Sequence, residues 1–269
     1  MQREQTEPEN AVIRRLTADP KSFPASVHPS VAEYLYQLVR RIKPALVFEI
    51  GCYIGFSTLH MARALKENGS GRLVSFDLNT GVASDNIKEA CLSDHVEFIQ
   101  GNSSVTVKQY FLDHGDGKID LVFIDGDHTR RGCVADFNAL HDHVKKDGYI
   151  IFHDIYPERC RWKGPRLVLD YLKTAKTFFT QFDVVERADI DAFGIGICRM
   201  VSQGKNPLIV IPWPKRMSLC LKTSRVSRWL ELKTFDAHYE RYLDQRQSNP
   251  LIFLFNIILR GCSKFGKFL

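Results

Sequence analysis

The stretch Phe48-Glu49-Ile50-Gly51-Cys52-Tyr53-Ile54-Gly55-Phe56-Ser57-Thr58 decides the fold of this 269-residue chain. An apolar run precedes it and a segment with helical apolar periodicity follows it, so the pattern predicts a strand, a tight turn and a helix. Gly51 and Gly55 let the backbone turn sharply and admit a ligand without a Cβ in the way. Glu49 lies near the end of the predicted strand, at the edge where ligands of open α/β sheets bind.

The spacing of the glycines distinguishes this turn from a dinucleotide-binding fingerprint. The pattern is E-x-G-x-x-x-G, whereas a turn that cradles a pyrophosphate reads G-x-G-x-x-G. The stretch resembles motif I of the class I S-adenosylmethionine (SAM) dependent methyltransferases, in which the turn wraps a ligand without phosphate. A plain strand-to-helix turn of some other α/β protein is the alternative at this point.

Composition describes an ordinary globular chain, with 44% hydrophobic and 25% charged residues. The first residues are polar, without an apolar signal segment, and no run of about 20 apolar residues predicts a membrane span. Seven cysteines are scattered without a C-x-x-C pair, which argues against a zinc site or a disulfide framework. These features predict a cytoplasmic protein of one or two domains.

Positive charge is concentrated in the last quarter of the chain. Residues 201–269 hold 12 Lys and Arg against 4 Asp and Glu, whereas residues 1–200 hold 25 against 27. The basic character therefore concerns partners of the tail and not the sheet domain. Nucleic-acid binding is not expected, because the preceding domain is slightly acidic and carries no recognition motif.

Alternating apolar and helical patterns predict a Rossmann-like, three-layer α/β domain with a seven-stranded, mainly parallel sheet. The last two strands are joined by a short polar turn and predict a hairpin with an antiparallel final strand. The expected strands are 46–50, 73–77, 96–99, 120–124, 149–153, 182–186 and 193–199. The expected helices are 56–67, 84–92, 103–112, 131–145 and 164–175.

Three parts are expected along the chain. Residues 1–44 form an N-terminal helical cover, in which about the first 20 residues are loose and a helix from Pro29 packs on the sheet or roofs the cleft. Residues 45–200 form the SAM-binding domain. Residues 201–269 form a basic helical tail, which is either a dimerisation or lid element or, through 247–269, an amphipathic contact with the inner membrane surface.

Polar residues follow the second and third predicted strands. Asp77 ends the second strand, where its carboxylate can accept hydrogen bonds from two ribose hydroxyls. A strand-end aspartate that caps a turn is the alternative. Asn102 and Ser103 follow the third strand and can either bond adenine or cap the next helix.

The densest cluster of chemistry-bearing residues is Asp125-Gly126-Asp127-His128, at the end of the fourth strand. His128 is a candidate general base for removing the proton of an acceptor hydroxyl. Asp125 is a candidate for orienting the methionine end of SAM or for holding a metal. Asp154 follows the fifth strand, and two carboxylates at one sheet edge suit Mg²⁺. The alternative is that Asp127 and His128 only begin a helix.

Together these motifs resemble the compact class I group that contains catechol-type and macrolide-sugar O-methyltransferases. The resemblance covers residues 45 to about 200 and implies that Glu49, Gly51, Gly55, Asp77, Asn102, Ser103 and Asp125 contact SAM. In cation-dependent members, an aspartate after the fourth strand and an Asp-Asn pair after the fifth bind the metal. Asp125 and Asp154 match this pattern, whereas Ile155 stands at the place of the asparagine.

The sequence thus predicts SAM-dependent O-methylation of a small-molecule hydroxyl, on a sugar or a glycosylated metabolite. His128 and Asp125 are the expected catalytic residues, and a loop with Trp162 and Arg166 is expected beside the acceptor. One rival is a nicotinamide-dependent oxidoreductase, which the missing third glycine disfavours. The other is a non-catalytic module that binds SAM or recruits a membrane or partner. A homo-oligomer is compatible with the sequence.

Overall fold

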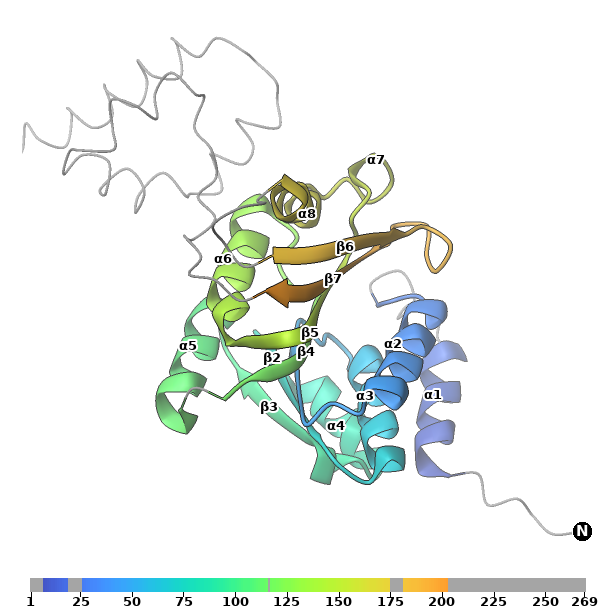
Figure 1. The fold of residues 1–269 in the computed structure, drawn as a ribbon. Helices are drawn as coiled ribbons and strands as arrows, with labels where there is room; N and C mark the ends of the chain where they lie inside the picture. Colours follow the sequence, from blue (N-terminus) through green and yellow to red (C-terminus); the bar gives the residue numbers. More distant parts are fainter. Residues whose placement is uncertain (1–6, 19–25, 116, 175–180, 203–269) are drawn as a thin grey trace, which may run out of the picture. The chain divides into compact units, whose positions relative to one another are not determined.

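Figure 1 shows the computed structural model of the chain, in which residues 7–18, 26–115, 117–174 and 181–202 are described. Helices and strands alternate through most of these residues. In chain order they are α1 (Pro8–Ala18), α2 (Pro29–Ile42), β1 (Leu46–Ile50), α3 (Phe56–Asn68), β2 (Arg72–Asp77), α4 (Gly81–Glu89), η2 (Ser93–His95), β3 (Val96–Gln100), α5 (Ser103–His114), β4 (Ile119–Ile124), α6 (Arg130–Leu140), η3 (His141–His143), β5 (Val144–His153), α7 (Pro157–Cys160), α8 (Gly164–Thr174), β6 (Gln181–Arg187) and β7 (Ile195–Ser202).

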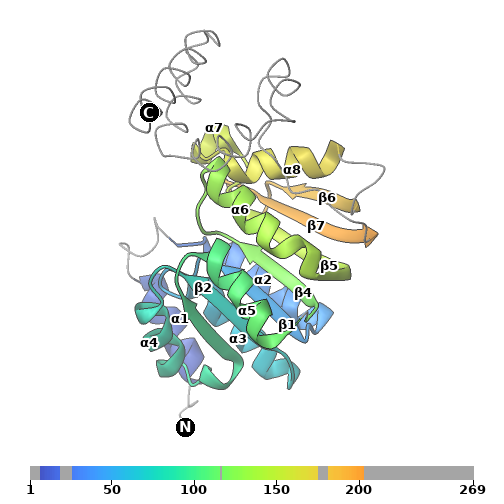
Figure 2. The same ribbon diagram turned by 90° about the vertical axis from the view of Figure 1, so that its left-hand side faces the viewer.

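The seven strands form one sheet in the order β3-β2-β1-β4-β5-β7-β6. Strands β1 to β5 pair in parallel, and β7 pairs antiparallel with both β5 and β6. Helices α1 to α4 cover one face of the sheet, and α5, α6 and α8 cover the other (Figures 1 and 2). The predicted three-layer sheet and its final hairpin are confirmed.

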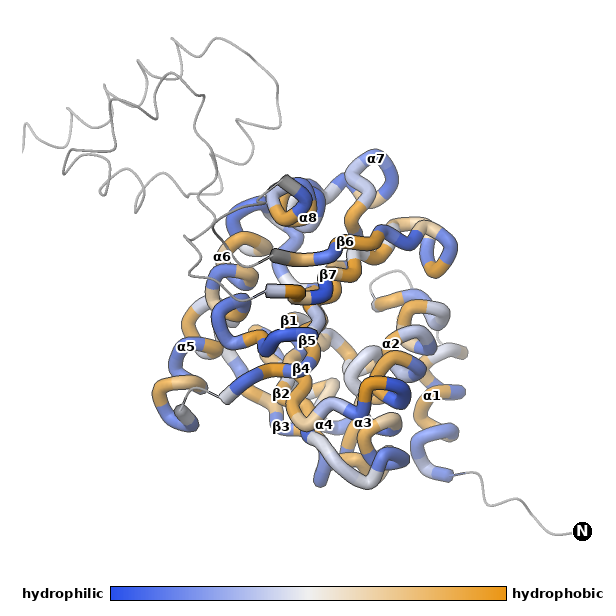
Figure 3. The backbone as a smooth tube through the Cα atoms, viewed as in Figure 1, coloured by the Kyte–Doolittle hydropathy of each residue, from blue (hydrophilic) through white to orange (hydrophobic). Residues whose placement is uncertain are grey.

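The central strands are apolar because both faces of the sheet are covered. Every residue of β1 and of β4 is buried, and Figure 3 shows the contrast with the helices, along which hydrophilic and hydrophobic segments alternate. Phe48, Phe123 and Phe152 from three neighbouring strands are fully buried. Continuous apolar runs of this kind are typical of parallel strands.

The N-terminal segment differs from the expectation of a loose chain, because residues 8–18 form a helix. Val12 and Leu16 lie on one face of α1 and are buried in the core. Polar side chains of α1 also contact α3 and α4. Lys66 Nζ of α3 lies 2.9 Å from a carboxylate oxygen of Glu9, and Arg15 donates to Asn86 of α4 at 2.8 Å. Two buried apolar residues were too short a pattern to predict the helix.

Helix α2 packs against one face of the sheet and against α3. Its buried residues Val31, Leu35 and Val39 belong to the same hydrophobic cluster as Val47 of β1 and Phe123 of β4. Two positions were expected for this helix, packed on the sheet or above the cleft. The structure shows the first of them. Ser26 and Val27, which lie three and two residues before the helix, line a cavity at the carboxyl edge of the sheet.

The boundary between α6 and β5 also differs from the expectation. The helical pattern over 131–145 ends at Leu140, and β5 begins at Val144, which pairs with Ile119 of β4. A register shift separates this pair from the remainder of the ladder, so the early part of β5 carries exposed polar residues. Those polar residues hid the start of the strand. The predicted tail, from residue 203 onward, lies outside the described residues.

Candidate active site

The turn between β1 and α3 is built around two glycines in the left-handed region. Gly51 has φ 86° and Gly55 has φ 81°. A Cβ on Gly51 would lie 2.5 Å from the carbonyl oxygen of Asp125, and one on Gly55 would lie 3.1 Å from Ala83. The turn therefore depends on glycine for its conformation and, at Gly51, for its close contact with the end of β4.

Glu49 lies beneath this turn and is fully buried. Its carboxylate accepts hydrogen bonds from the hydroxyls of Ser57 at 2.5 Å, Thr58 at 2.6 Å and Ser75 at 2.7 Å. Burial raises the pKa of Glu49 to about 7, against the three hydroxyls that lower it. The structure thus places Glu49 where it joins β1, β2 and the start of α3, under the residues that line the cavity.

Asp77, at the end of β2, lies beside the glycine turn. One carboxylate oxygen accepts from the backbone amides of Cys52 at 2.8 Å and Tyr53 at 3.0 Å, and the other accepts from the amide of Asn79 at 3.0 Å. Asp77 and Gly51 both line the same cavity. The aspartate therefore fixes the turn through one oxygen while its side chain faces the cavity.

The residues that follow β3 begin α5, and one of them forms a hydrogen bond with α6 at the wall of the cavity. Asn102 caps α5 by accepting from the amide of Ser104 at 3.1 Å. Ser103 donates to Oδ1 of Asp136 at 2.5 Å, and Oδ2 of that buried carboxylate has no hydrogen-bond partner among the described residues. Burial raises the pKa of Asp136 to about 7. Asn102, Ser103 and Asp136 all line the cavity.

Two carboxylates and two imidazoles meet at the ends of β4 and β5. Oδ1 of Asp125 lies 3.0 Å from Nε2 of His128 and 3.0 Å from Nδ1 of His153. The carboxylate of Asp154 lies 3.4 Å from each of the same two nitrogens. One ligand atom from each of these four residues lies within 4.8 Å of all the others.

The protonation of this cluster is set by its opposite charges. Burial alone would raise the pKa of Asp125, but the charge of His153 and the hydrogen bonds from both imidazoles lower it well below its usual range. Burial would lower the pKa values of His128 and His153, and the facing carboxylates instead raise both. The pKa of Asp154 is raised, mainly by burial.

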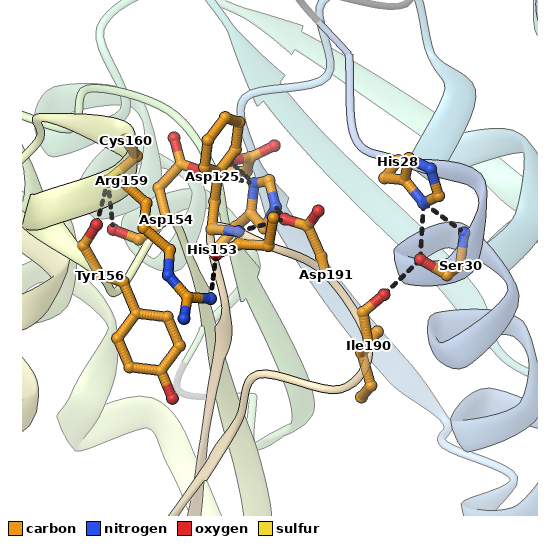
Figure 4. Close-up of polar contacts among 12 residues, drawn as sticks. His28, Ser30, Asp125, His153, Asp154, Tyr156, Arg159, Cys160, Ile190 and Asp191 are labelled. Atoms are coloured by element: carbon orange, nitrogen blue, oxygen red, sulfur yellow. Dashed lines mark hydrogen bonds and ion pairs between the residues drawn. The ribbon is translucent and has the colours of Figure 1, made fainter.

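Two further features mark Asp154 and His153. Asp154 has φ 57°, in a region that residues other than glycine seldom adopt, and within the described part of the chain its buried Oδ1 has no hydrogen-bond partner. His153 directs its second nitrogen, Nε2, at Oδ2 of Asp191 over 3.0 Å (Figure 4). Asp191 lies in the loop between β6 and β7, so the hairpin contributes a carboxylate to the cluster.

His128 is held from two sides. Its ring stacks on Trp162 with 5.8 Å between ring centres, and its carbonyl oxygen accepts from the amide of Gly164 at 3.0 Å. Trp162 is half exposed at the cavity wall. Arg166, from the same loop that is expected beside the acceptor, pairs its guanidinium with Asp170 and Glu186.

The cavity that these residues share has a volume of about 1010 Å³ and runs along the carboxyl edge of the sheet. Sequence reasoning did not single out three of the residues described above: Asp136, His153 and Asp191. His153 stands beside the predicted Asp154, so a motif of consecutive donor residues was the signal that could have found it. Asp136 and Asp191 carried no such signal, because each meets its partner only through the fold.

The comparisons with known proteins agree with this architecture. A family model described as a methyltransferase domain matches residues 48–155. A catechol O-methyltransferase of Niastella koreensis is 32% identical over 105 residues, which are 38% of this chain and 46% of that protein. A transmembrane O-methyltransferase of Propithecus coquereli is 33% identical over 181 residues, 65% of this chain and 63% of that protein. The chain spans between about half and two thirds of the length of these curated relatives.

Solved structures share the fold. The O-methyltransferase of Bacillus cereus, in complex with S-adenosylhomocysteine, superposes with a TM-score of 0.58 at 21% identity, over 74% of this chain and 93% of that one. An O-methyltransferase of Streptomyces achromogenes, in complex with SAM, gives 0.56 at 18% identity over 74% and 92%. No helix in the described part of the chain combines the length and the apolar character needed to cross a bilayer.

Proposed function

We propose that this chain, which belongs to the class I SAM-dependent methyltransferases, transfers a methyl group from SAM to a hydroxyl of a small molecule. One observation carries the proposal. The same cavity is lined by Asp77 and the glycine turn and by the imidazole–carboxylate cluster that includes His128. Its volume of about 1010 Å³ is at the upper end of ordinary ligand sites. A nucleoside-sized donor and a small acceptor can therefore be bound side by side.

For SAM, the ribose hydroxyls are assigned to Asp77 and the methionine end to the turn at Gly51 and to Asp125. The support for Asp77 is its place on the cavity wall and its fixed carboxylate. Gly55 and Glu49 act through the shape of the turn, because neither of them lines the cavity and Glu49 is fully buried. This division gives each residue a role that its surroundings allow.

Adenine is assigned to the part of the cavity lined by Asn102, Ser103 and Asp136. The unpartnered Oδ2 of Asp136 is a hydrogen-bond acceptor in a buried position. A buried polar atom without a partner costs about 1–3 kcal/mol, which a ligand donor would recover. The exocyclic amine of adenine is such a donor.

The acceptor is assigned to the part of the cavity that Trp162 and Phe193 line. Both side chains are substantially exposed, at 46% and 42%. Aromatic faces of this kind can pack against the C–H face of a sugar ring, so a sugar or a glycosylated metabolite is the proposed acceptor. Trp162 also keeps the ring of His128 in place by stacking on it.

In the proposed reaction, the acceptor oxygen forms a bond to the methyl carbon while the carbon–sulfur bond breaks, which leaves S-adenosylhomocysteine. The hydroxyl proton passes to the imidazole of His128. Asp125 orients this imidazole from 3.0 Å. A divalent cation at Asp125 and Asp154, which the resemblance assigns as Mg²⁺, would lower the pKa of the acceptor hydroxyl and fix its position.

Calorimetry with SAM and with S-adenosylhomocysteine tests the donor site without knowledge of the acceptor. We expect binding by the full chain and a loss of affinity of about 5- to 150-fold in Asp77→Ala, equivalent to about 1–3 kcal/mol for removal of a paired polar group. Exposed Asp85→Ala is the control and is expected to bind like the unmodified chain. The absence of binding heat at millimolar SAM would overturn the proposal.

A second proposal concerns residues 247–269, where the sequence predicts contact with a membrane surface. These residues lie outside the described part of the chain, so the support is the apolar segment and its basic flanks alone. Flotation with anionic vesicles is expected to recover the full chain but not a chain that ends at residue 246. Equal recovery of both would refute the membrane role. Sedimentation of the full chain tests whether it forms a homo-oligomer, with which the sequence is compatible.

A further inference from the structure

We propose that Asp125, His153 and Asp154, with His128 beside them, hold a divalent transition-metal ion, and that the site prefers such an ion over Mg²⁺. The role of the ion rests on the proposed methyl transfer. Its binding does not, because ion binding can be measured without SAM. It departs from the oxygen-only magnesium site that the resemblance implies, because the imidazole of His153 adds a nitrogen to the two carboxylates.

The distances within the cluster fit a coordination shell. Zinc and similar ions bind nitrogen and oxygen ligands at about 2.1 Å, which places neighbouring ligand atoms about 3.0 Å apart in an octahedral shell and about 3.4 Å apart in a tetrahedral one. Nδ1 of His153 lies 3.0 Å from Oδ1 of Asp125 and 3.4 Å from Oδ1 of Asp154.

A second and independent observation concerns Oδ1 of Asp154. The residue is only 8% exposed, and no described residue forms a hydrogen bond with this oxygen. The atom faces the cluster, since Nδ1 of His153 is the group that the structure records near it. A desolvated carboxylate oxygen without a donor is costly unless a cation completes its environment.

The third observation is the carboxylate behind His153. A histidine that binds a metal through one nitrogen commonly donates its other N–H to a carboxylate, which fixes the tautomer and the orientation of the ring. Oδ2 of Asp191 lies 3.0 Å from Nε2 of His153 and leaves Nδ1 directed at Asp125 (Figure 4). The structure thus supplies the outer carboxylate as well as the inner ligands.

Asp191 is itself fixed, although it lies in a hairpin loop. Its Oδ2 accepts from the amide of Phe193 at 3.2 Å, and its carbonyl oxygen accepts from the amide of Gly194 at 3.1 Å. The neighbouring Ile190 accepts a hydrogen bond from the hydroxyl of Ser30 at the start of α2 (Figure 4). A carboxylate anchored in this way can hold the ring of His153 in one orientation.

The donor set decides the kind of ion. Mg²⁺ prefers six oxygen ligands and keeps several waters, whereas imidazole suits zinc, iron, cobalt and nickel. Ile155, which stands where relatives with a magnesium site have an asparagine, is fully buried and offers no side-chain oxygen. His153, one position before Asp154, supplies the third donor instead. Nitrogen therefore replaces oxygen at this point of the site.

The test is titration of the metal-free full chain with Co²⁺, Zn²⁺ and Mg²⁺, followed by calorimetry and, for Co²⁺, by visible absorption. We expect Co²⁺ and Zn²⁺ to bind at least about tenfold more tightly than Mg²⁺. His153→Gln is expected to weaken Co²⁺ by about 10- to 100-fold and to change its spectrum, and Asp191→Asn to weaken it by about tenfold. Asp127→Asn, an exposed carboxylate that hydrogen-bonds only within its own turn, is the matched control.

Pulsed electron paramagnetic resonance of the Mn²⁺-loaded unmodified chain gives a readout that needs no variant. Imidazole nitrogen coupled to the ion is the expected result. Equal affinity for Mg²⁺ and Co²⁺, or a spectrum without nitrogen coupling, would overturn the inference. SAM binding with no ion binding would refute the metal site and leave the methyltransferase proposal standing. Ion binding without SAM binding would support the metal site and refute the methyltransferase proposal.

Discussion

A Cβ on Gly51 would lie 2.5 Å from the carbonyl oxygen of Asp125, so the turn after β1 and the end of β4 are in direct backbone contact. This contact places the proposed methionine end of SAM against the imidazole–carboxylate cluster. Gly51 also has φ 86°, so any other residue would be strained for two separate reasons.

The two reasons can be separated with a second glycine. Gly69 has φ 69° but faces open space. Both alanine variants carry the left-handed strain of about 1–2 kcal/mol, and we expect Gly51→Ala to lose about 1–3 kcal/mol more than Gly69→Ala in urea unfolding, because only Gly51 adds a steric overlap. Gly51→Ala should also weaken SAM binding. Equal destabilisation by both variants would show that the backbone contact is not tight.

Glu49 gives a prediction for the pH dependence of stability. Its pKa is raised from 4.5 to about 7 in the folded chain. The folded state therefore holds this proton more tightly than the unfolded state, so the contribution to stability is fully present below pH 4.5 and is lost as the pH rises through 7. The shift corresponds to about 3 kcal/mol.

The measurement is the free energy of unfolding of Glu49→Gln and of the unmodified chain, in urea from pH 4.5 to 8. We expect the unmodified chain to lose up to about 3 kcal/mol relative to the variant over this range, because only its carboxyl must ionise beneath the turn. The exposed Glu158→Gln serves as control. A difference between the two chains that stays constant with pH would mean that Glu49 is already charged at low pH.

The fold followed from the sequence because its signals are local. Apolar runs, each ended by glycine or a polar residue, specify the strands, and the turn at Gly51 specifies their direction. Glu49 shows where local signals stop. Its register partner on β2 is Ser75, and this pairing draws the carboxylate into a buried network of hydroxyls. The register that pairs residues 26 positions apart along the chain was not available from the pattern of either strand.

The parts of the candidate site that lie within one segment could be predicted from the sequence, whereas contacts between distant segments could not. Asp125 and His128 lie in one motif, and the structure brings their side chains to 3.0 Å. His153 and Asp191 lie on different elements, β5 and the hairpin loop, and meet at 3.0 Å only because β7 returns antiparallel beside β5. Such a contact depends on where a loop is held, which composition and spacing do not determine.

Asp136 gives a prediction about the donor. If its unpartnered Oδ2 accepts from the amine of adenine, Asp136→Ala should bind SAM about 5- to 20-fold more weakly, the equivalent of one net hydrogen bond. The inosine analogue of SAM, which lacks the amine, should bind the unmodified chain more weakly than SAM does. The Asp136→Ala variant should bind the analogue and SAM with about equal affinity. Calorimetry with both ligands measures the two effects.

Asp127→Ala is the control for this comparison, since Asp127 is an exposed carboxylate in the loop that leads into α6, the helix of Asp136, and it accepts a hydrogen bond from the amide of Thr129. It should keep the preference for SAM over the inosine analogue. An unmodified chain that binds both ligands equally would remove Asp136 from adenine recognition, whatever the variant does to overall affinity.

His128 gives the prediction closest to the chemistry. Its imidazole lies 3.0 Å from Asp125 and stacks on Trp162, so His128→Ala removes the proposed base without touching the ribose or adenine contacts. We expect turnover to fall by about 10²- to 10⁴-fold, as for loss of a general base, with unchanged affinity for SAM. Release of S-adenosylhomocysteine is measured with a panel of sugars and catechols, at an ion concentration that saturates both proteins. Trp162→Leu is the companion variant, in which a raised KM for the acceptor with a smaller loss of kcat is expected. Turnover of His128→Ala equal to that of the unmodified chain would show that the proton leaves by another route.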